Sequence, residues 1–323
     1  MSDLLKNIDA RTKLAGTNKL EILLFSLGTD ARTGRRETFG INVFKVREVM
    51  RTPPITAAPE MPPSVEGMVS LRGALVPVVD LARYAGVDTQ TPRSIMIITE
   101  YAGHTQGFLV EGVDTILRLD WGQMRVPPAM LLAELGGLVT AVTELPDGRL
   151  VMMMDVEKIL SETTNYDDEI VYRNIKPLDN PRLTVFFADD SSVARKQIER
   201  TLGAMGVKYV AAINGLDAWL ELEKMAAYAQ ASGQAVTDLI SLVLTDIEMP
   251  EMDGYILTKK IKSDPRFVGV PVIMHSSLSG MSNQQLGKSV GVDEYVPKFE
   301  PQRLSETLTR RLQGGGVPAL PSC

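Results

Sequence analysis

The most constraining feature of this 323-residue sequence is a short apolar run, Leu242–Thr245, that stops abruptly at Asp246. Loop signals follow at Met249-Pro250 and Asp253-Gly254, so the run has the length and boundaries of a buried strand. A buried strand that ends in a carboxylate is a common way to build a site in an open α/β sheet. The alternative is that Asp246 only caps the next helix.

The C-terminal part of the chain repeats this pattern, since apolar strand-like runs alternate with amphipathic segments of helical length. Strands are also expected at 183–188, 209–212, 270–275 and 294–297, and helices at 193–205, 216–231, 254–262, 282–290 and 304–312. This alternation predicts a (βα)5 domain with a parallel, doubly wound sheet of the flavodoxin-like α/β type. The stretch 216–239 is long for one helix and its connection, so we expect an extended helix there.

Polar side chains stand where the predicted strands end, and parallel strands bring these ends to one edge of the sheet. They are Asp189, Asp190, Asp246, Ser276 and Lys298. Converging carboxylates repel one another, and Mg²⁺ would relieve this, because it takes a few carboxylates and bridges to phosphate oxygens. Lysine and serine suit contacts to a phosphoryl group. The set predicts phosphoryl transfer to an acid, against the alternative of separate caps and surface groups.

Residues 183–312, which carry these motifs, resemble a two-component receiver domain. The resemblance implies that Asp246 is phosphorylated from a kinase phosphohistidine. It also implies that Asp189 and Asp190 hold Mg²⁺ together with Asp246, with the backbone carbonyl of Glu248 as a further ligand.

The same resemblance makes Ser276 and Tyr295 a switch pair and Lys298 the lysine that contacts the phosphate. One departure concerns this lysine. Receivers usually read Lys-Pro-Phe, with a cis peptide bond before the proline, whereas this chain reads Lys298-Phe299-Glu300-Pro301. Because a cis bond without proline costs roughly 2.5–4 kcal/mol, the loop is expected to be rearranged, and the direction of Lys298 stays open.

The N-terminal part, from residue 19 to about 160, has a different pattern of many short strands punctuated by Gly and Pro. Strands are expected at 21–27, 38–43, 46–50, 94–99, 107–113 and 151–154, with a hairpin over 70–81 that turns at Arg72-Gly73. This pattern predicts an antiparallel barrel or sandwich. The segment shows no Ser/His/Asp set and no metal-ligand spacing, so we expect no enzyme activity from it.

Four motifs in this part resemble the CheW family of bacterial chemotaxis coupling proteins. They lie at Phe39–Val49, Leu71–Leu81, Val110–Asp114 and Asp155–Leu160. The resemblance implies two small SH3-like β-barrels and a scaffold that binds a histidine kinase, CheA, and the cytoplasmic tip of a chemoreceptor.

By position, Val46, Glu48 and Arg72 fall where the CheW family contacts its partners. The alternatives are that Val46 is a core residue, Glu48 a solvated acid and Arg72 an ordinary turn residue. An exposed Arg beside a rigid β-turn is a good planar anchor for a partner, which favours the functional interpretation for Arg72.

Composition limits the remaining classes of function. The chain is 44% hydrophobic and 23% charged with a net charge of -6, and no Lys/Arg-rich run indicates nucleic-acid binding. Its single cysteine, Cys323, allows no internal disulfide. No apolar run reaches the roughly 20 residues of a membrane helix, and the N-terminus lacks a signal-peptide core. We therefore expect a cytoplasmic protein without direct membrane insertion, and the resemblance to the CheW family implies that it is recruited to membrane-associated receptor arrays.

A CheW-like part followed by a receiver resembles the CheV family. The expected organisation is an extension (1–18), a coupling domain (19–162), a linker (163–181), a receiver (182–313) and a tail (314–323). We expect a non-enzymatic adaptor tuned by phosphorylation. One alternative is a phosphate sink that only drains the kinase. The other is a Mg²⁺-dependent phosphatase with Asp246 as nucleophile, although Glu248 stands where such enzymes usually carry a second Asp.

Overall fold

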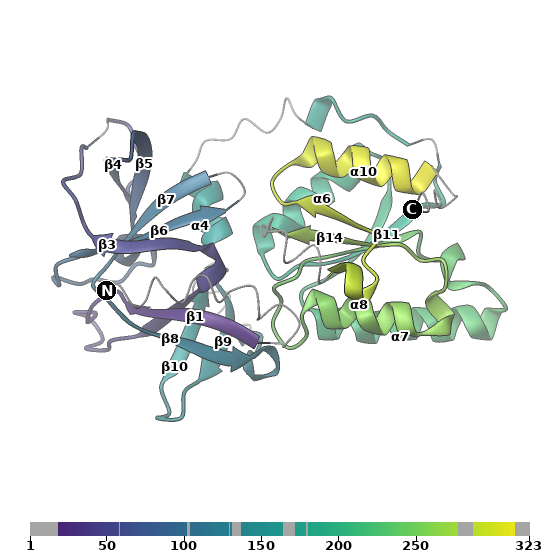
Figure 1. Cartoon of the computed structure of the whole chain (residues 1–323), viewed down its shortest axis with the longest axis horizontal. Helices are drawn as coiled ribbons and strands as arrows, with labels where there is room; N and C mark the ends of the chain where they lie inside the picture. The colour runs from purple at the N-terminus through teal and green to yellow at the C-terminus, as the bar shows by residue number, and fades with distance from the viewer. Residues whose placement is uncertain are drawn as a thin grey trace, which may run out of the picture. The chain divides into compact units, whose positions relative to one another are not determined.

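The computed structural model describes residues 19–57, 59–101, 104–128, 130, 137–163, 172–178, 180–276 and 287–313. The chain divides into two compact units, Met1–Tyr166 and Asp167–Cys323 (Figure 1). The N-terminal extension and the C-terminal tail lie outside the described residues. Within the described ranges, no helix combines the length and apolarity needed to cross a membrane.

The N-terminal unit contains two five-stranded sheets. The first has the order β8-β1-β2-β10-β9, made of Gly112–Asp120, Lys19–Ser26, Thr38–Asn42, Leu150–Met154 and Val139–Glu144. The second has the order β3-β6-β7-β5-β4, made of Val46–Arg51, Ile95–Tyr101, His104–Val110, Ala74–Asp80 and Val65–Leu71. Each sheet closes through one isolated β-bridge. In the first sheet Arg125, which follows β8, pairs with Val142 on β9, and in the second Thr56, which follows β3, pairs with Met68 on β4. Both sheets are therefore small barrels, which we call the first and the second barrel.

The two barrels share one topology. In each order the neighbouring strands pair antiparallel, antiparallel, parallel and antiparallel. In each, a hairpin leads into a helix, β4-β5 into α2 (Leu81–Tyr84) and β9-β10 into α4 (Val156–Thr163). Asp80 and Asp155 are equivalent, since their carboxylates accept the amides of Arg83 and Lys158 at 3.1 and 3.0 Å. Of the other three strands of the first barrel, β1 and β2 come from the N-terminal end of the unit and β8 from its middle.

The strand β1 is buried on both faces. Leu23 and Phe25 enter a core shared by both barrels, whereas Ile22 and Leu24 fill the interior of the first barrel. A strand covered on both faces needs no alternating polar positions, which is why residues 22–25 of β1 form a continuous apolar run.

Several elements of this unit were not predicted from the sequence. The expected strand 107–113 is two strands in the structure, because β7 ends at Val110 and β8 begins at Gly112. No residue of β8 is fully buried, and its apolar residues Val113, Ile116, Leu117 and Leu119 pack only partly buried against the two cores. The strand β9 and the helix α4 were also missed, as were the 3-10 helices Val43–Lys45 and Trp121–Gln123.

The C-terminal unit contains one parallel sheet of five strands with the order β12-β11-β13-β14-β15. The strands are Lys208–Ala212, Thr184–Ala188, Leu242–Thr245, Val272–Ser276 and Glu294–Pro297. The helices are α6 (Ser192–Ala204), α7 (Gly215–Ser232), α8 (Gly254–Ser263) and α10 (Pro301–Gln313), with 3-10 helices at Val236–Asp238 and Pro265–Phe267. This doubly wound fold confirms the predicted class.

Two apolar cores lie on the two faces of this sheet. On one face α7 and α8 pack through residues such as Leu222 and Leu257, and on the other α6 and α10 pack through Leu202 and Leu308. Figure 1 shows the same two layers. The expected helix over 282–290 is described only at 287–290, where the chain is helical.

Candidate functional site

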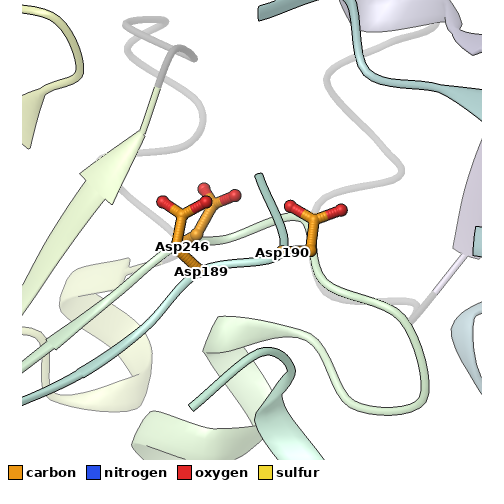
Figure 2. Close-up of side chains that lie close together, drawn as sticks. All are labelled: Asp189, Asp190 and Asp246. Carbon is orange, nitrogen blue, oxygen red and sulfur yellow. The ribbon is translucent and has the colours of Figure 1, made fainter. Parts of the chain in front are cut away.

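Three carboxylates meet at the carboxyl end of the parallel sheet in the C-terminal unit. Asp189 and Asp190 directly follow β11, and Asp246 directly follows its neighbour β13. One oxygen from each lies within 4.8 Å of the others (Figure 2). Asp189 and Asp246 are buried, with 0% and 4% of their surface exposed. The sheet register therefore brings together acids that are far apart in the sequence.

Lys298 neutralises part of this negative charge. Its Nζ lies 2.9 Å from Asp246 Oδ2 and 2.9 Å from Asp189 Oδ2, and the lysine is only 2% exposed. A fully buried lysine is stable in its charged form only when it is paired, and here two acids share it. The structure thus gives Lys298 the direction that the sequence left open.

The loop after β15 reaches this geometry without the proline that is usual in receivers. Among the described residues no peptide bond is cis, and Phe299 adopts a left-handed backbone with φ 63°. A non-glycine residue in this region carries strain of roughly 1–2 kcal/mol. The loop is therefore rearranged at Phe299 while Lys298 still contacts both acids.

The backbone around Asp246 is held from the side of α8. Asp246 Oδ1 accepts the amide of Ile247 at 2.6 Å. Asp253 caps α8 by accepting the amide of Ile256 at 2.7 Å. A Cβ on Gly254 would collide with the Asp246 carbonyl oxygen, so only glycine permits this close approach. Burial raises the pKa of Asp253 to about 6.

The remaining predicted receiver residues stand at neighbouring strand ends. Ser276 is 4% exposed at the end of β14, and its carbonyl accepts the amide of Lys298 at 3.2 Å. Tyr295 lies on β15, half-buried against Ile247 and Met274. Its hydroxyl is hydrogen-bonded to Tyr255, and burial raises its pKa. These contacts tie the end of β14 to the lysine loop.

The donor set fits a small hard cation. Carboxylate oxygens are the ligands that Mg²⁺ prefers, and it is usually bound through a few of them while it keeps several waters. Asp189, Asp190 and Asp246 supply three such oxygens within reach of one ion. Glu248 is half-buried two residues after Asp246, where the resemblance placed a carbonyl ligand.

The residues predicted to contact partners lie on the second barrel. Glu48 on β3 pairs with Arg72 at 2.9 Å, and 69% of the Arg72 side chain is exposed. Arg72 has φ 51° in the tight β4-β5 turn, which fixes its position. Val46 is only 7% exposed and belongs to the shared core, where it lies at the start of β3.

Comparison with known proteins assigns each unit to a domain family. The CheW-like domain model matches residues 21–164, and the response regulator receiver domain model matches residues 185–309. Chemotaxis protein CheV3 of Helicobacter pylori is 30% identical over 282 residues, which cover 85% of this chain and 88% of that protein. This chain belongs to the CheV family of chemotaxis proteins.

Other relatives agree with the CheV assignment. Chemotaxis protein CheV1 of Helicobacter pylori is 27% identical over 334 residues. The matched region spans 97% of this chain and 99% of CheV1. Chemotaxis protein CheW of Klebsiella aerogenes is 30% identical over 154 residues, 46% of this chain and 87% of that protein. The chain is thus a chemotaxis signalling adaptor with a receiver domain, as the sequence resemblance predicted.

Some residues of the CheV receiver site were missed by the sequence analysis. Asp253 and Gly254 were noted only as loop signals, although they cap α8 and approach the Asp246 backbone. Arg195 was not noted at all, yet its guanidinium contacts the turn that carries Asp189 and Asp190. A basic residue one turn inside the helix that follows an acidic pair is the only signal that could have pointed to it.

Proposed function

We propose that this protein is a coupling adaptor tuned by phosphorylation. Its CheW-like unit links the histidine kinase CheA to the cytoplasmic tips of chemoreceptors, and Mg²⁺-dependent phosphorylation of Asp246 adjusts that link. The observation that supports this most directly is the buried Lys298 shared by Asp246 and Asp189, beside the third carboxylate of Asp190. Such a cluster of acids and one cation suits phosphoryl transfer.

In the proposed reaction the Asp246 carboxylate attacks the phosphorus of a kinase phosphohistidine. An O–P bond forms, the P–N bond breaks, and its electron pair returns to the imidazole nitrogen. A Mg²⁺ ion held by Asp189, Asp190 and Asp246 would neutralise charge on the phosphoryl oxygens. Lys298 already contacts Asp246 Oδ2, while the Ile247 amide holds Oδ1, so the carboxylate is oriented before the kinase arrives.

The proposed output begins with the added charge of the phosphoryl group, about -1.5 to -2. Ser276 and Lys298 lie at adjacent strand ends, joined by a backbone hydrogen bond of 3.2 Å. A change at Lys298 on phosphorylation would therefore move the end of β14 and the Tyr295 contacts, which shifts the receiver between two states. In this proposal the altered receiver changes how the CheW-like unit couples receptor and kinase.

Phosphotransfer from purified, phosphorylated CheA in the presence of Mg²⁺ tests the first half. We expect label on the wild-type protein and none on Asp246→Asn. Asp264→Asn is the matched control, because it removes an acid at the opposite end of α8 and should keep the label. Absence of label from the wild type would refute the proposal, and label on Asp246→Asn would refute the assignment of the acceptor.

Co-sedimentation with receptor arrays and CheA tests the second half, through the Glu48–Arg72 pair. Arg72→Glu is expected to weaken binding. The double variant Glu48→Arg/Arg72→Glu restores the internal ion pair but inverts the surface charge. If the double variant regains binding, the pair is only structural; if it does not, the charges face a partner. Phosphorylation without any array binding by the wild type would favour a phosphate sink.

A further inference from the structure

The turn between β11 and α6 is held by a single arginine. Arg195 is the fourth residue of α6, and Nη1 of its guanidinium donates to the carbonyl oxygens of Asp189 and Asp190, at 2.8 Å each. Its backbone amide donates to the carbonyl of Ser191 at 3.0 Å. One residue therefore binds three consecutive carbonyl groups of the turn that carries two of the three clustered acids.

These contacts follow from the direction of helical side chains. A long side chain in a helix points back toward the helix N-terminus, so a residue one turn inside α6 reaches the preceding turn. Hydrogen bonds from a charged donor are stronger than neutral ones, and two carbonyls held by one planar group cannot rotate independently. Arg195 thus fixes the backbone orientation of Asp189 and Asp190, and with it the starting direction of their side chains.

The acids themselves oppose this arrangement. Their oxygens lie within 4.8 Å of one another and of Asp246, and Lys298 contacts Asp189 and Asp246. Repulsion among three clustered carboxylates favours moving them apart, and a fixed backbone opposes that movement. The amide of Ser191 bonds Asp189 Oδ1 at 2.9 Å, which holds the first carboxylate, whereas Arg195 holds the backbone of both.

We propose that Arg195 is a positioning residue for the divalent-cation site: it holds the Asp189–Asp190 turn in the form that binds the ion, without touching the ion or the phosphoryl group. The part of this inference that concerns Mg²⁺ binding rests on the proposed function. Partners that orient metal ligands from behind typically contribute 10- to 100-fold to affinity, and we expect about that weakening when the guanidinium is removed.

The test compares Arg195→Gln and Arg195→Lys with the control Lys196→Gln in the full-length protein. Lys196 is the exposed neighbour on α6, so its replacement changes net charge equally without touching the turn. Mg²⁺ affinity is measured by calorimetry. We expect a loss of roughly 10-fold or more for Arg195→Gln, a smaller loss for Arg195→Lys, and almost none for the control. Equal weakening by Arg195→Gln and Lys196→Gln would overturn positioning in favour of general electrostatics.

Two further measurements separate positioning from a merely structural or a chemical role. With a small phosphodonor such as acetyl phosphate, the rate for Arg195→Gln should approach that of the wild type at saturating Mg²⁺. A rate that stays low would mean that Arg195 acts on the phosphoryl group. Without metal, the Ser191 amide should exchange with solvent faster in the variant. Unchanged exchange would overturn the inference.

Failure of the inference is distinguishable from failure of the proposed function. If the wild type binds no Mg²⁺, the proposed function fails, and amide exchange still decides whether Arg195 holds the turn. If Arg195→Gln does not fold, as judged by its melting temperature, Arg195→Lys decides. That variant should keep the wild-type melting temperature and bind Mg²⁺ more weakly, and wild-type affinity in it would refute the positioning role.

Discussion

Asp253 gives the receiver a pH dependence that can be calculated from its surroundings. Its carboxyl group is 5% exposed and caps α8, and burial raises its pKa from 3.8 to about 6. The folded state therefore holds this proton more tightly than the unfolded state. Stability from this group is fully present below about pH 4, and it is lost as the pH rises toward about 6. A shift of this size corresponds to roughly 3 kcal/mol.

Replacement of Asp253 by Asn removes the charge and keeps a side-chain oxygen that can accept the Ile256 amide. In the wild-type protein this hydrogen bond is 2.7 Å long. From about pH 4 to about pH 7, the unfolding free energy of Asp253→Asn should rise relative to the wild type by roughly 3 kcal/mol. The quantity to compare is the difference in unfolding free energy between variant and wild type, because other carboxyl groups change stability with pH in the opposite direction. The Arg266 side chain, for example, lowers the pKa of Asp264.

Urea unfolding at several pH values, followed by tryptophan fluorescence, measures this difference. The chain has two tryptophans, so a Trp121→Phe background leaves Trp219 as the reporter. Trp219 lies in the receiver core, with its ring 6.0 Å from that of Phe267. A difference between variant and wild type that stays constant from about pH 4 to about pH 7 would refute the buried-charge reasoning.

Two further predictions concern the loop that carries the buried cation. Lys298→Met leaves the carboxylates of Asp189 and Asp246 without their shared partner, so metal-free protein should lose roughly 3–5 kcal/mol of stability in denaturant titrations. Added Mg²⁺ should restore part of the loss, and a loss under about 1 kcal/mol would contradict the pairing. Phe299→Pro should lower the receiver melting temperature, because proline fixes φ near -65° where this loop has 63°. Phe299→Gly is the control and should be tolerated, and wild-type stability in the proline variant would contradict the left-handed backbone.

Local sequence patterns were sufficient for the receiver fold. Its three central strands, β11, β13 and β14, are buried on both faces, so their sequences are mostly apolar, and the alternation with helices leaves few possible topologies. The same pattern predicted that Asp189, Asp190 and Asp246 would meet, because parallel strands end at one edge. The CheW-like unit was harder to read, since β8 has no fully buried residue and the first barrel combines strands from both ends of the unit.

Only the tertiary structure decided the contacts made by long side chains. Lys298 is followed by Phe299 and not by the proline that is usual in receivers. The left-handed backbone at Phe299 nevertheless lets the lysine ammonium group reach two acids. The pairing of Glu48 with Arg72 and the three-carbonyl contact of Arg195 likewise depend on backbone positions fixed elsewhere. Sequence by itself determined which strand ends carry charge, because that follows from local periodicity. The partner of each charge depends on flexible side chains and on distances of a few ångströms, which arise only when the whole chain packs.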